Sequence, residues 1–336
     1  MRDDDADVLV SRVRDAVRAG RTAEATRAAT ALADGWPEVR AWAEWVLAGC
    51  HGLDGAPDRA LAVLARADGE GRWWAAALLD DPALTDVWSL PGGTGLRRRS
   101  LARSASQAGA TGPVWVTDRD ARTRCVAAVL HGNGPLPLSL QRTLWSTVPE
   151  VRALAVTSPH LVAPGVATWR DAASAHAQVT AAVQEAHSTE PDLPVVLVGL
   201  GAGGTATARA VAARHVGVAG AVVVAAPVPR EPATDTPGRA DDVDHPHVDR
   251  EEPRGVVVLH DTAQTDHGPW PAWAAQHDVP LTTTAVDDLG HAFPPRFAAT
   301  MRAAVGTLVP LADGGPSAAP PSVPAAGPHV AREVPA

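Results

Sequence analysis

The sequence predicts an α/β protein whose mostly parallel sheet carries helices on both faces, preceded by a small all-α region of helical hairpins. From residue 113 onward, short runs rich in valine, alanine and leucine alternate with helical segments. This alternation is typical of buried parallel strands joined by helical crossovers. Before residue 86, apolar residues recur only at helical spacing. With 336 residues, of which 46% are hydrophobic, the chain is large enough to form two such domains.

The first domain, residues 1–85, is predicted to contain four helices. The first ends at Gly20, and the others cover about 25–33, 37–50 and 57–68. The tripeptide Ala-Asp-Gly occurs at 33–35 and again at 67–69, an offset of about 34 residues that is typical of tetratricopeptide helix pairs. A tetratricopeptide-like array and a generic helical cap both fit this pattern.

A linker at 86–112 separates this region from the α/β domain at 113–310. Glycine and proline at 91–95 interrupt regular structure, and the basic stretch at 97–103 is predicted to be a solvated helix. Strands are predicted at 114–117, 125–130, 152–157, 195–199, 219–225, 255–259 and 281–286. The helices between and after them are predicted at 169–187, 205–215, 270–277 and 295–308.

Two segments lack apolar periodicity. Residues 229–253 are rich in proline and aspartate and predict a mobile acidic loop, and residues 311–336 predict a disordered tail. The acidic loop holds several Asp and His residues, but a flexible stretch offers no fixed ligand geometry, so we expect no metal site there. The sequence predicts no cofactor.

Composition excludes several classes of protein. A formal charge of −9 without clustered cations argues against nucleic-acid binding. The acidic N-terminus is unlike a signal peptide, and no apolar run approaches the roughly 20 residues that span a bilayer, so we expect a cytoplasmic protein without a membrane partner. Cys50 and Cys125 lie in different predicted domains and are expected to be core residues without a disulfide.

Three turns at the carboxyl ends of predicted strands carry the candidate site, because open α/β sheets place their sites at this edge. The first follows the strand at 125–130 and contains His131, Gly132, Asn133 and Gly134. The second, from Gly199 to Gly203, joins an apolar strand to a small-residue helix and places Gly201 at its apex. The third contains His291 and precedes the last helix.

These turns, in this order, resemble those of the α/β-hydrolase superfamily, specifically its compact serine esterases of the phospholipase/carboxylesterase and dienelactone-hydrolase type. The resemblance covers residues 113–310. It implies that the backbone amides of Asn133 and Ala202 would stabilise an oxyanion and that His291 would be the general base. Asp266, or alternatively Asp261, would orient that histidine.

The sequence departs from this family at the nucleophile. Esterases of this type place a serine at the centre of Gly-x-Ser-x-Gly, whereas Gly201 occupies that position between Gly199 and Gly203. The nearby hydroxyls of Thr205 and Thr207 would lie within the following helix and point elsewhere. Since acyl transfer needs an oxygen or sulfur nucleophile, the sequence predicts a catalytically impaired hydrolase.

Such a protein would bind a small ester-like ligand, or use its N-terminal helices to hold a protein partner. An alternative is an active hydrolase of carboxylic esters or lactones in which His291 activates a water. Trp169, Trp270 and Trp273 are expected to be packing residues rather than pocket residues.

A third alternative is a dinucleotide-binding fold, because residues 199–204 also match Gly-x-Gly-x-x-Gly. That fold expects an acidic residue at the tip of the next strand, where this chain has Ala226-Pro227-Val228.

Overall fold

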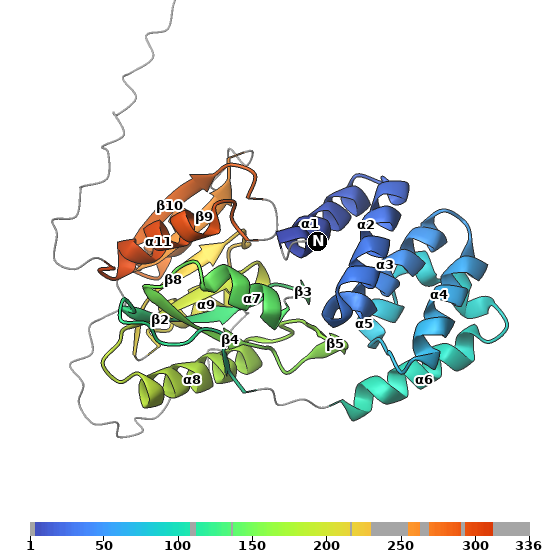
Figure 1. Ribbon diagram of the computed structural model, residues 1–336, viewed down its shortest axis with the longest axis horizontal. Coiled ribbons are helices and arrows are strands. Elements are labelled where there is room, and N and C mark those ends of the chain that lie inside the picture. The colour runs from blue at the N-terminus through green and yellow to red at the C-terminus, as the bar shows by residue number, and fades with distance from the viewer. Residues whose placement is uncertain are drawn as a thin grey trace, which may run out of the picture.

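The computed structural model describes residues 4–107, 112–135, 137–215, 217–229, 255–262, 269–289 and 293–311. The described chain has a helical N-terminal region beside an α/β region (Figure 1). No described helix is long and apolar enough to cross a membrane.

The α/β region is built on a seven-stranded sheet with the order β1-β4-β2-β7-β8-β9-β10. All neighbouring strands are parallel except the edge pair β1–β4, which is antiparallel. The strands are β1 (Val114–Trp115), β2 (Cys125–Leu130), β4 (Val151–Val156), β7 (Val195–Leu200), β8 (Val218–Val224), β9 (Val256–Asp261) and β10 (Leu281–Val286). All seven predicted strands are therefore confirmed, with ends within two residues of the predicted ones.

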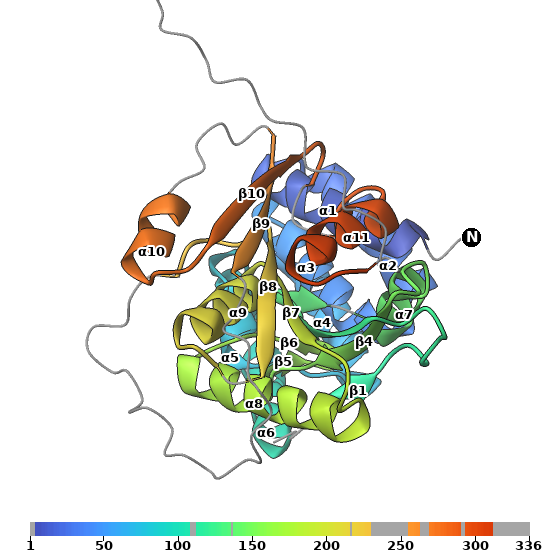
Figure 2. The same ribbon diagram turned by 90° about the vertical axis from the view of Figure 1, so that its left-hand side faces the viewer.

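Helices cover both faces of the sheet (Figure 2). Helices α8 (Ala172–Thr189), α9 (Ala202–Ala212) and α10 (Trp270–Gln276) pack on one face, and α7 (Leu138–Trp145) and α11 (Phe297–Leu308) on the other. Successive side chains of β2 alternate between these faces, Val126 toward α8 and α9 and Ala127 toward α11. Because both faces of the central strands β2, β7 and β8 are buried, these strands need apolar residues at nearly every position, whereas the edge strand β10 is mostly exposed and carries three threonines.

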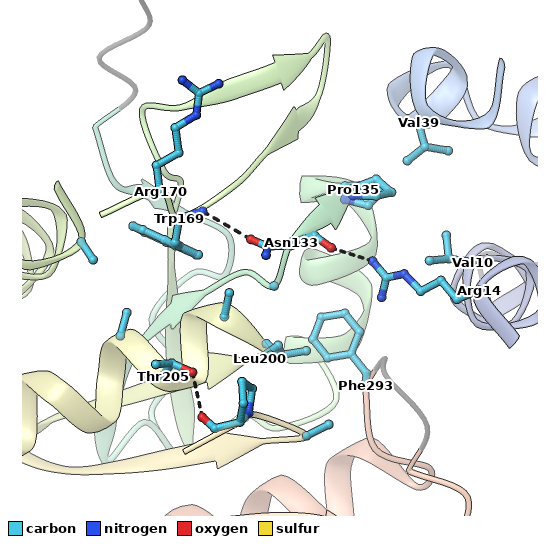
Figure 3. A pocket seen from close by; sticks show the side chains of 18 of the residues that line it. Val10, Arg14, Val39, Asn133, Pro135, Trp169, Arg170, Leu200, Thr205 and Phe293 are labelled. Atoms are coloured by element: carbon cyan, nitrogen blue, oxygen red, sulfur yellow. Dashed lines mark hydrogen bonds between the residues drawn. The ribbon is translucent and has the colours of Figure 1, made fainter. Parts of the chain in front are cut away.

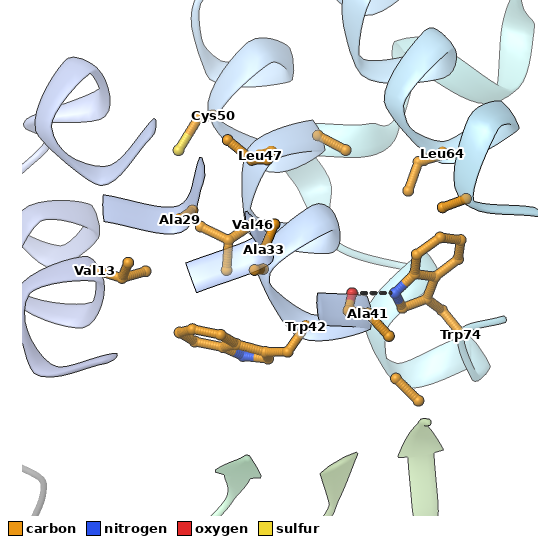
Figure 4. Close-up of a cluster of buried hydrophobic side chains, with 14 of the residues drawn as sticks. Val13, Ala29, Ala33, Ala41, Trp42, Val46, Leu47, Cys50, Leu64 and Trp74 are labelled. Atoms are coloured by element: carbon orange, nitrogen blue, oxygen red, sulfur yellow. Dashed lines mark hydrogen bonds between the residues drawn. The ribbon is translucent and has the colours of Figure 1, made fainter. Parts of the chain in front are cut away.

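The N-terminal region is all-helical, as predicted. Its helices α1 (Asp4–Arg18), α2 (Thr22–Gly35), α3 (Arg40–Leu53) and α4 (Pro57–Gly69) pack against their neighbours in chain order. Their core is lined by alanine and leucine, and Trp74 closes it by donating its indole N–H to the carbonyl of Ala41 at 2.8 Å (Figure 4). The tetratricopeptide-like character of this region stays a prediction.

The segment predicted as a linker also packs against these helices. Its helix α6 (Gly93–Ser106) places Ser100 against the backbone of Trp74, from which Ser100 Oγ accepts at 2.6 Å. Arg99 and Arg103 of α6 both bind the carboxylate of Asp68 on α4. The basic stretch is thus bound to the helical region through these contacts, and we assign residues 93–106 to that region.

A small second sheet joins the two regions and was not expected from the sequence. Its strands are β3 (Gly134–Pro135), β6 (Val166–Ala167) and β5 (Leu161–Ala163), in that order. Val162 and Val166 belong to the same buried cluster as the N-terminal helices. Ala75, which precedes the short helix α5 (Ala76–Leu79), donates its backbone N–H to the carbonyl of Val162 at 2.8 Å.

The remaining expectations concern the cysteines and the two non-periodic segments. Cys50 and Cys125 are free and buried, as predicted, and burial raises the pKa of Cys125 to about 12. The predicted loop at 229–253 and the predicted tail at 311–336 lie almost entirely outside the described residues.

Candidate functional site

The backbone at Gly201 forms the sharp corner that the sequence predicts between β7 and α9. Its dihedral angles are φ +50° and ψ −118°, in a region that residues with side chains rarely adopt. A strained strand-to-helix corner of this kind holds the nucleophile at the top of the sheet in α/β-hydrolases. Gly201 lies at the apex of the corner between β7 and α9.

Two flanking glycines are required by close backbone packing. A Cβ on Gly203 would overlap the carbonyl oxygen of His131, and one on Gly199 would overlap the carbonyl of Gly203. The environment of Gly201 differs, because the nearest atom to a Cβ there would be the Cα of Gly132 at 3.7 Å. The apex thus has room for a side chain and faces the turn that follows β2.

That turn is supported by the buried ring of His131. Its Nε2 accepts the backbone N–H of Ser158 at 3.0 Å, so the ring proton lies on Nδ1, which faces the carbonyl of Gly132 at 2.5 Å. Burial lowers the pKa of His131 and favours this neutral form. Trp169 stacks on the ring, with centroids 5.0 Å apart, and donates its indole N–H to the carbonyl of His131 at 2.7 Å. His131 therefore holds the turn in place and does not present its ring to a ligand.

Asn133 connects this turn to the N-terminal helices. Its side-chain oxygen accepts from the hydroxyl of Thr168 at 2.8 Å, and its backbone carbonyl accepts from Arg14 of α1 at 3.1 Å. The Arg14 guanidinium lies where a Cβ of residue 134 would be, and Gly134 has φ +131°. Glycine at position 134 thus makes space for an arginine that lies 120 positions earlier in the chain.

A cavity of about 450 Å³ opens over the apex (Figure 3). Its floor includes Leu200, Gly201 and Ala202, and Gly132 and Asn133 form part of its wall. The opposite side comes from the helical region: Val10, Arg14 and Arg18 of α1, and Val39 of the short helix η1 (Pro37–Val39). The structure therefore brings the first two predicted turns together and adds a wall that the sequence did not predict.

Of the residues predicted as the general base and its acidic partner, the structure describes only Asp261. His291 and Asp266 lie outside the described residues. Asp261 ends β9, two strands from β7 in the sheet, and does not line the cavity. Among the described residues no cluster of His, Cys, Asp and Glu could hold a metal ion.

The remaining tryptophans and threonines are clearly placed. Trp270 and Trp273 are buried in the core, as predicted, whereas Trp169 lines the cavity, so its expected role as a packing residue alone is wrong. Thr205 donates its hydroxyl to the carbonyl of Pro227 at 2.9 Å, and Thr207 donates to Gly204 at 2.8 Å. Both residues lie within α9, as predicted, and both hydroxyls are directed to backbone carbonyls, although Thr205 also lines the cavity.

The sheet topology argues against the dinucleotide-binding alternative. Taken in chain order, the six parallel strands have the spatial order 2-1-3-4-5-6, whereas the dinucleotide fold has 3-2-1-4-5-6. The glycine-rich turn follows the third parallel strand here and the first in that fold. The strand order, the antiparallel edge strand and the corner at Gly201 together define an α/β-hydrolase fold.

Comparison with known proteins found similarity to solved structures only. No protein-family model matches the sequence, and no curated protein matches it significantly. Similar solved structures include an uncharacterized protein from Bacillus cereus ATCC 10987, with 12% identity over 89% of this chain and 97% of that one, at a TM-score of 0.41. Esterase PE8 shares 15% identity over 59% of this chain and 100% of its own, at a TM-score of 0.43. The Bacillus cereus carboxylesterase shares 16% identity over 60% of this chain and 98% of its own, at a TM-score of 0.41. At TM-scores this low, these similarities carry no argument about activity.

Proposed function

We propose that this chain is a catalytically impaired α/β-hydrolase-fold protein, related to serine esterases, that binds a small ligand in the cavity over Gly201. The observation that carries this proposal is a nucleophile corner with glycine at its apex. Covalent acyl transfer needs an attacking oxygen or sulfur at that point, and glycine provides neither.

The surroundings of the apex support a binding role. The turn at Gly132, the amino end of α9 and the cavity all lie beside Gly201. In triad enzymes without their nucleophile, oxyanion donors and binding alone leave only about 10³- to 10⁴-fold acceleration over water. The cavity would then retain a ligand without efficient turnover.

One observation favours a second candidate, hydrolysis by a water that His291 activates. The space beside Gly201, where the nearest atom to a Cβ would be 3.7 Å away, could hold such a water. The labelling and hydrolysis experiment described next distinguishes this water-based route from the binding role. A protein partner for the helical region stays a further prediction.

The test introduces a hydroxyl oxygen at the apex by replacing Gly201 with serine. We expect the unmodified protein to resist labelling by a fluorophosphonate probe and Gly201→Ser to gain labelling and p-nitrophenyl acetate hydrolysis. Both should disappear in Gly201→Ser combined with His291→Ala. Gly203→Ser is a matched control, because a side chain there would overlap the His131 carbonyl and should give no activity.

Stoichiometric labelling of the unmodified protein would contradict the proposal. Ester hydrolysis by the unmodified protein without labelling, abolished by His291→Ala, would instead establish the water-based route. A well-folded but inactive Gly201→Ser variant would mean that the base, the acid or the oxyanion donors are also lost.

A further inference from the structure

Strand β10 forms an exposed edge of the main sheet. It is last in the strand order, and in the described part of the chain no strand pairs with its outer side (Figure 2). Its four inner residues, Thr282 to Ala285, are all exposed, so both faces of the strand are open to solvent there. Such an edge presents a row of unpaired backbone N–H and C=O groups that can pair with another strand.

The residues of β10 lack the features that usually prevent such pairing. Edge strands are commonly protected by charged side chains, by proline or by very short length. The opposite edge strand, β1, has only two residues. β10 has six, with the sequence Leu-Thr-Thr-Thr-Ala-Val, and none of them is charged or a proline. The strand therefore carries no charge that would repel a partner strand.

The backbone of β10 alternates between β9 and the open side. The carbonyl of Pro280 accepts from the first residue of β9 at 2.8 Å, and that of Val286 accepts from the residue after β9 at 3.3 Å. Because the backbone groups of successive residues point to opposite sides of a strand, the even-numbered residues of β10 face β9. Leu281, Thr283 and Ala285 therefore direct their N–H and C=O groups outward.

The side chains of β10 match a second copy of the same strand. In an antiparallel pair centred on Thr283, each Leu281 lies opposite Ala285 of the other copy. Each Thr282 then lies opposite Thr284, so every threonine faces a threonine, a cross-strand pair that stabilises sheets. In the same register the three outward-facing residues exchange backbone hydrogen bonds with their counterparts. The side-chain pattern and the direction of the backbone thus select one register.

Other segments of this chain match the edge less well. The segments 229–253 and 311–336 are both rich in proline, which has no backbone N–H to donate to a neighbouring strand. The acidic residues of the first segment would also meet no basic residue on β10. A second copy of β10 is therefore the partner whose sequence fits.

We propose that this chain forms a two-fold symmetric dimer in which β10 pairs antiparallel with β10 of a second copy, centred on Thr283. The two seven-stranded sheets would form one continuous sheet. Because such an interface is isologous, the assembly closes as a dimer. Helix α10 packs on the Leu281 face and exposes only uncharged residues, so its two copies would flank the strand pair on one side. The dimer is independent of the proposed function, because no residue of β10 lines the cavity.

Sedimentation equilibrium of the full-length protein tests the association. At micromolar concentration we expect a mass of about twice the 34.6 kDa of one chain. Thr283→Lys should raise the dimer dissociation constant at least about tenfold, because it places like charges opposite each other. Val114→Lys adds the same charge at an exposed position of the opposite edge strand β1 and should leave the constant unchanged. Melting temperatures verify that both variants fold.

Disulfide cross-linking tests the register. Thr283→Cys should form an intermolecular disulfide on oxidation, because hydrogen-bonded residues opposite each other in an antiparallel pair have Cα atoms about 5.5 Å apart. Thr282→Cys is the matched control and should not cross-link, since its two copies would not lie opposite each other. The native Cys50 and Cys125 are buried and do not compete.

A monomeric unmodified protein, or assemblies larger than a dimer, would overturn the inference. So would cross-linking of Thr284→Cys in place of Thr283→Cys, which would require a different register. Dissociation by Val114→Lys but not by Thr283→Lys would assign the interface to the opposite edge of the sheet and would equally contradict the proposal.

Discussion

At the scale of single residues, His131 shows how a residue of a site motif can act through the backbone. The sequence predicts it as part of an oxyanion turn by its position beside Gly132. In the structure both ring nitrogens are directed to the backbone, at Ser158 and Gly132, and Trp169 covers one face of the ring. The imidazole thus positions the turn, and it does so in its neutral form.

This role predicts a pH dependence of stability. Because burial lowers the pKa of His131 in the folded protein, the unfolded chain takes up the proton at a higher pH. The stabilising contribution is complete above the unfolded pKa of about 6.5 and decreases as pH falls below it, by at most about 1.4 kcal/mol per pH unit. We expect the melting temperature to fall less between pH 7.5 and 5.5 in His131→Gln than in the unmodified protein. His51→Gln, on α3, should retain the full dependence, and identical profiles for all three proteins would contradict this role.

At the scale of elements, the hairpin formed by β5 and β6 is one of the parts of the α/β region that contact the N-terminal helices. Its turn residue Gly165 has φ +71°, and a Cβ there would overlap the carbonyl oxygen of Glu38 in η1. Both the left-handed backbone and the close approach require glycine at this position.

Gly165→Ala should therefore loosen the contact between the regions. We expect it to lower the free energy of unfolding by at least about 2 kcal/mol more than Gly71→Ala does. Gly71 is a matched control, because it also has positive φ but no atom within 4 Å of a Cβ. Urea denaturation followed by tryptophan fluorescence measures both losses. Equal losses of unfolding free energy in the two variants would mean that a side chain at position 165 does not clash with η1.

The elements also show which parts of the fold the sequence predicts. Strands β2 and β10 were predicted to the residue, because apolar and β-branched runs bounded by turn signals identify strands, although β2 is buried and β10 is mostly exposed. The strands β3, β5 and β6 were missed, since each has two or three residues and proline or glycine lies within or beside it. Helix α9 begins three residues earlier than predicted, because its first turn contains the glycines that packing against β2 requires.

At the scale of the whole molecule, the cavity combines parts that the sequence predicts and a part that it does not. Gly201 and the turn at Gly132 were predicted to meet, because the carboxyl ends of adjacent parallel strands lie at one edge of a sheet. Arg14 could not be predicted. Arg14 lies on an amphipathic helix, where an arginine is expected to be exposed to solvent. Only the docking of the helical region brings its side chain to Asn133.

Docking of the helical region should also couple unfolding of the two parts. Val162 and Val166 of the small sheet are buried in the core of the helical region, so that core cannot open without exposing them. We expect one calorimetric transition for the unmodified protein and two for Val166→Asp, because a buried unpaired carboxylate would detach the helices. Val114→Asp, at an exposed position on the edge strand β1, should keep a single transition. Two separate transitions in the unmodified protein would show that the regions fold independently, and the cavity wall formed by α1 would then be free to open.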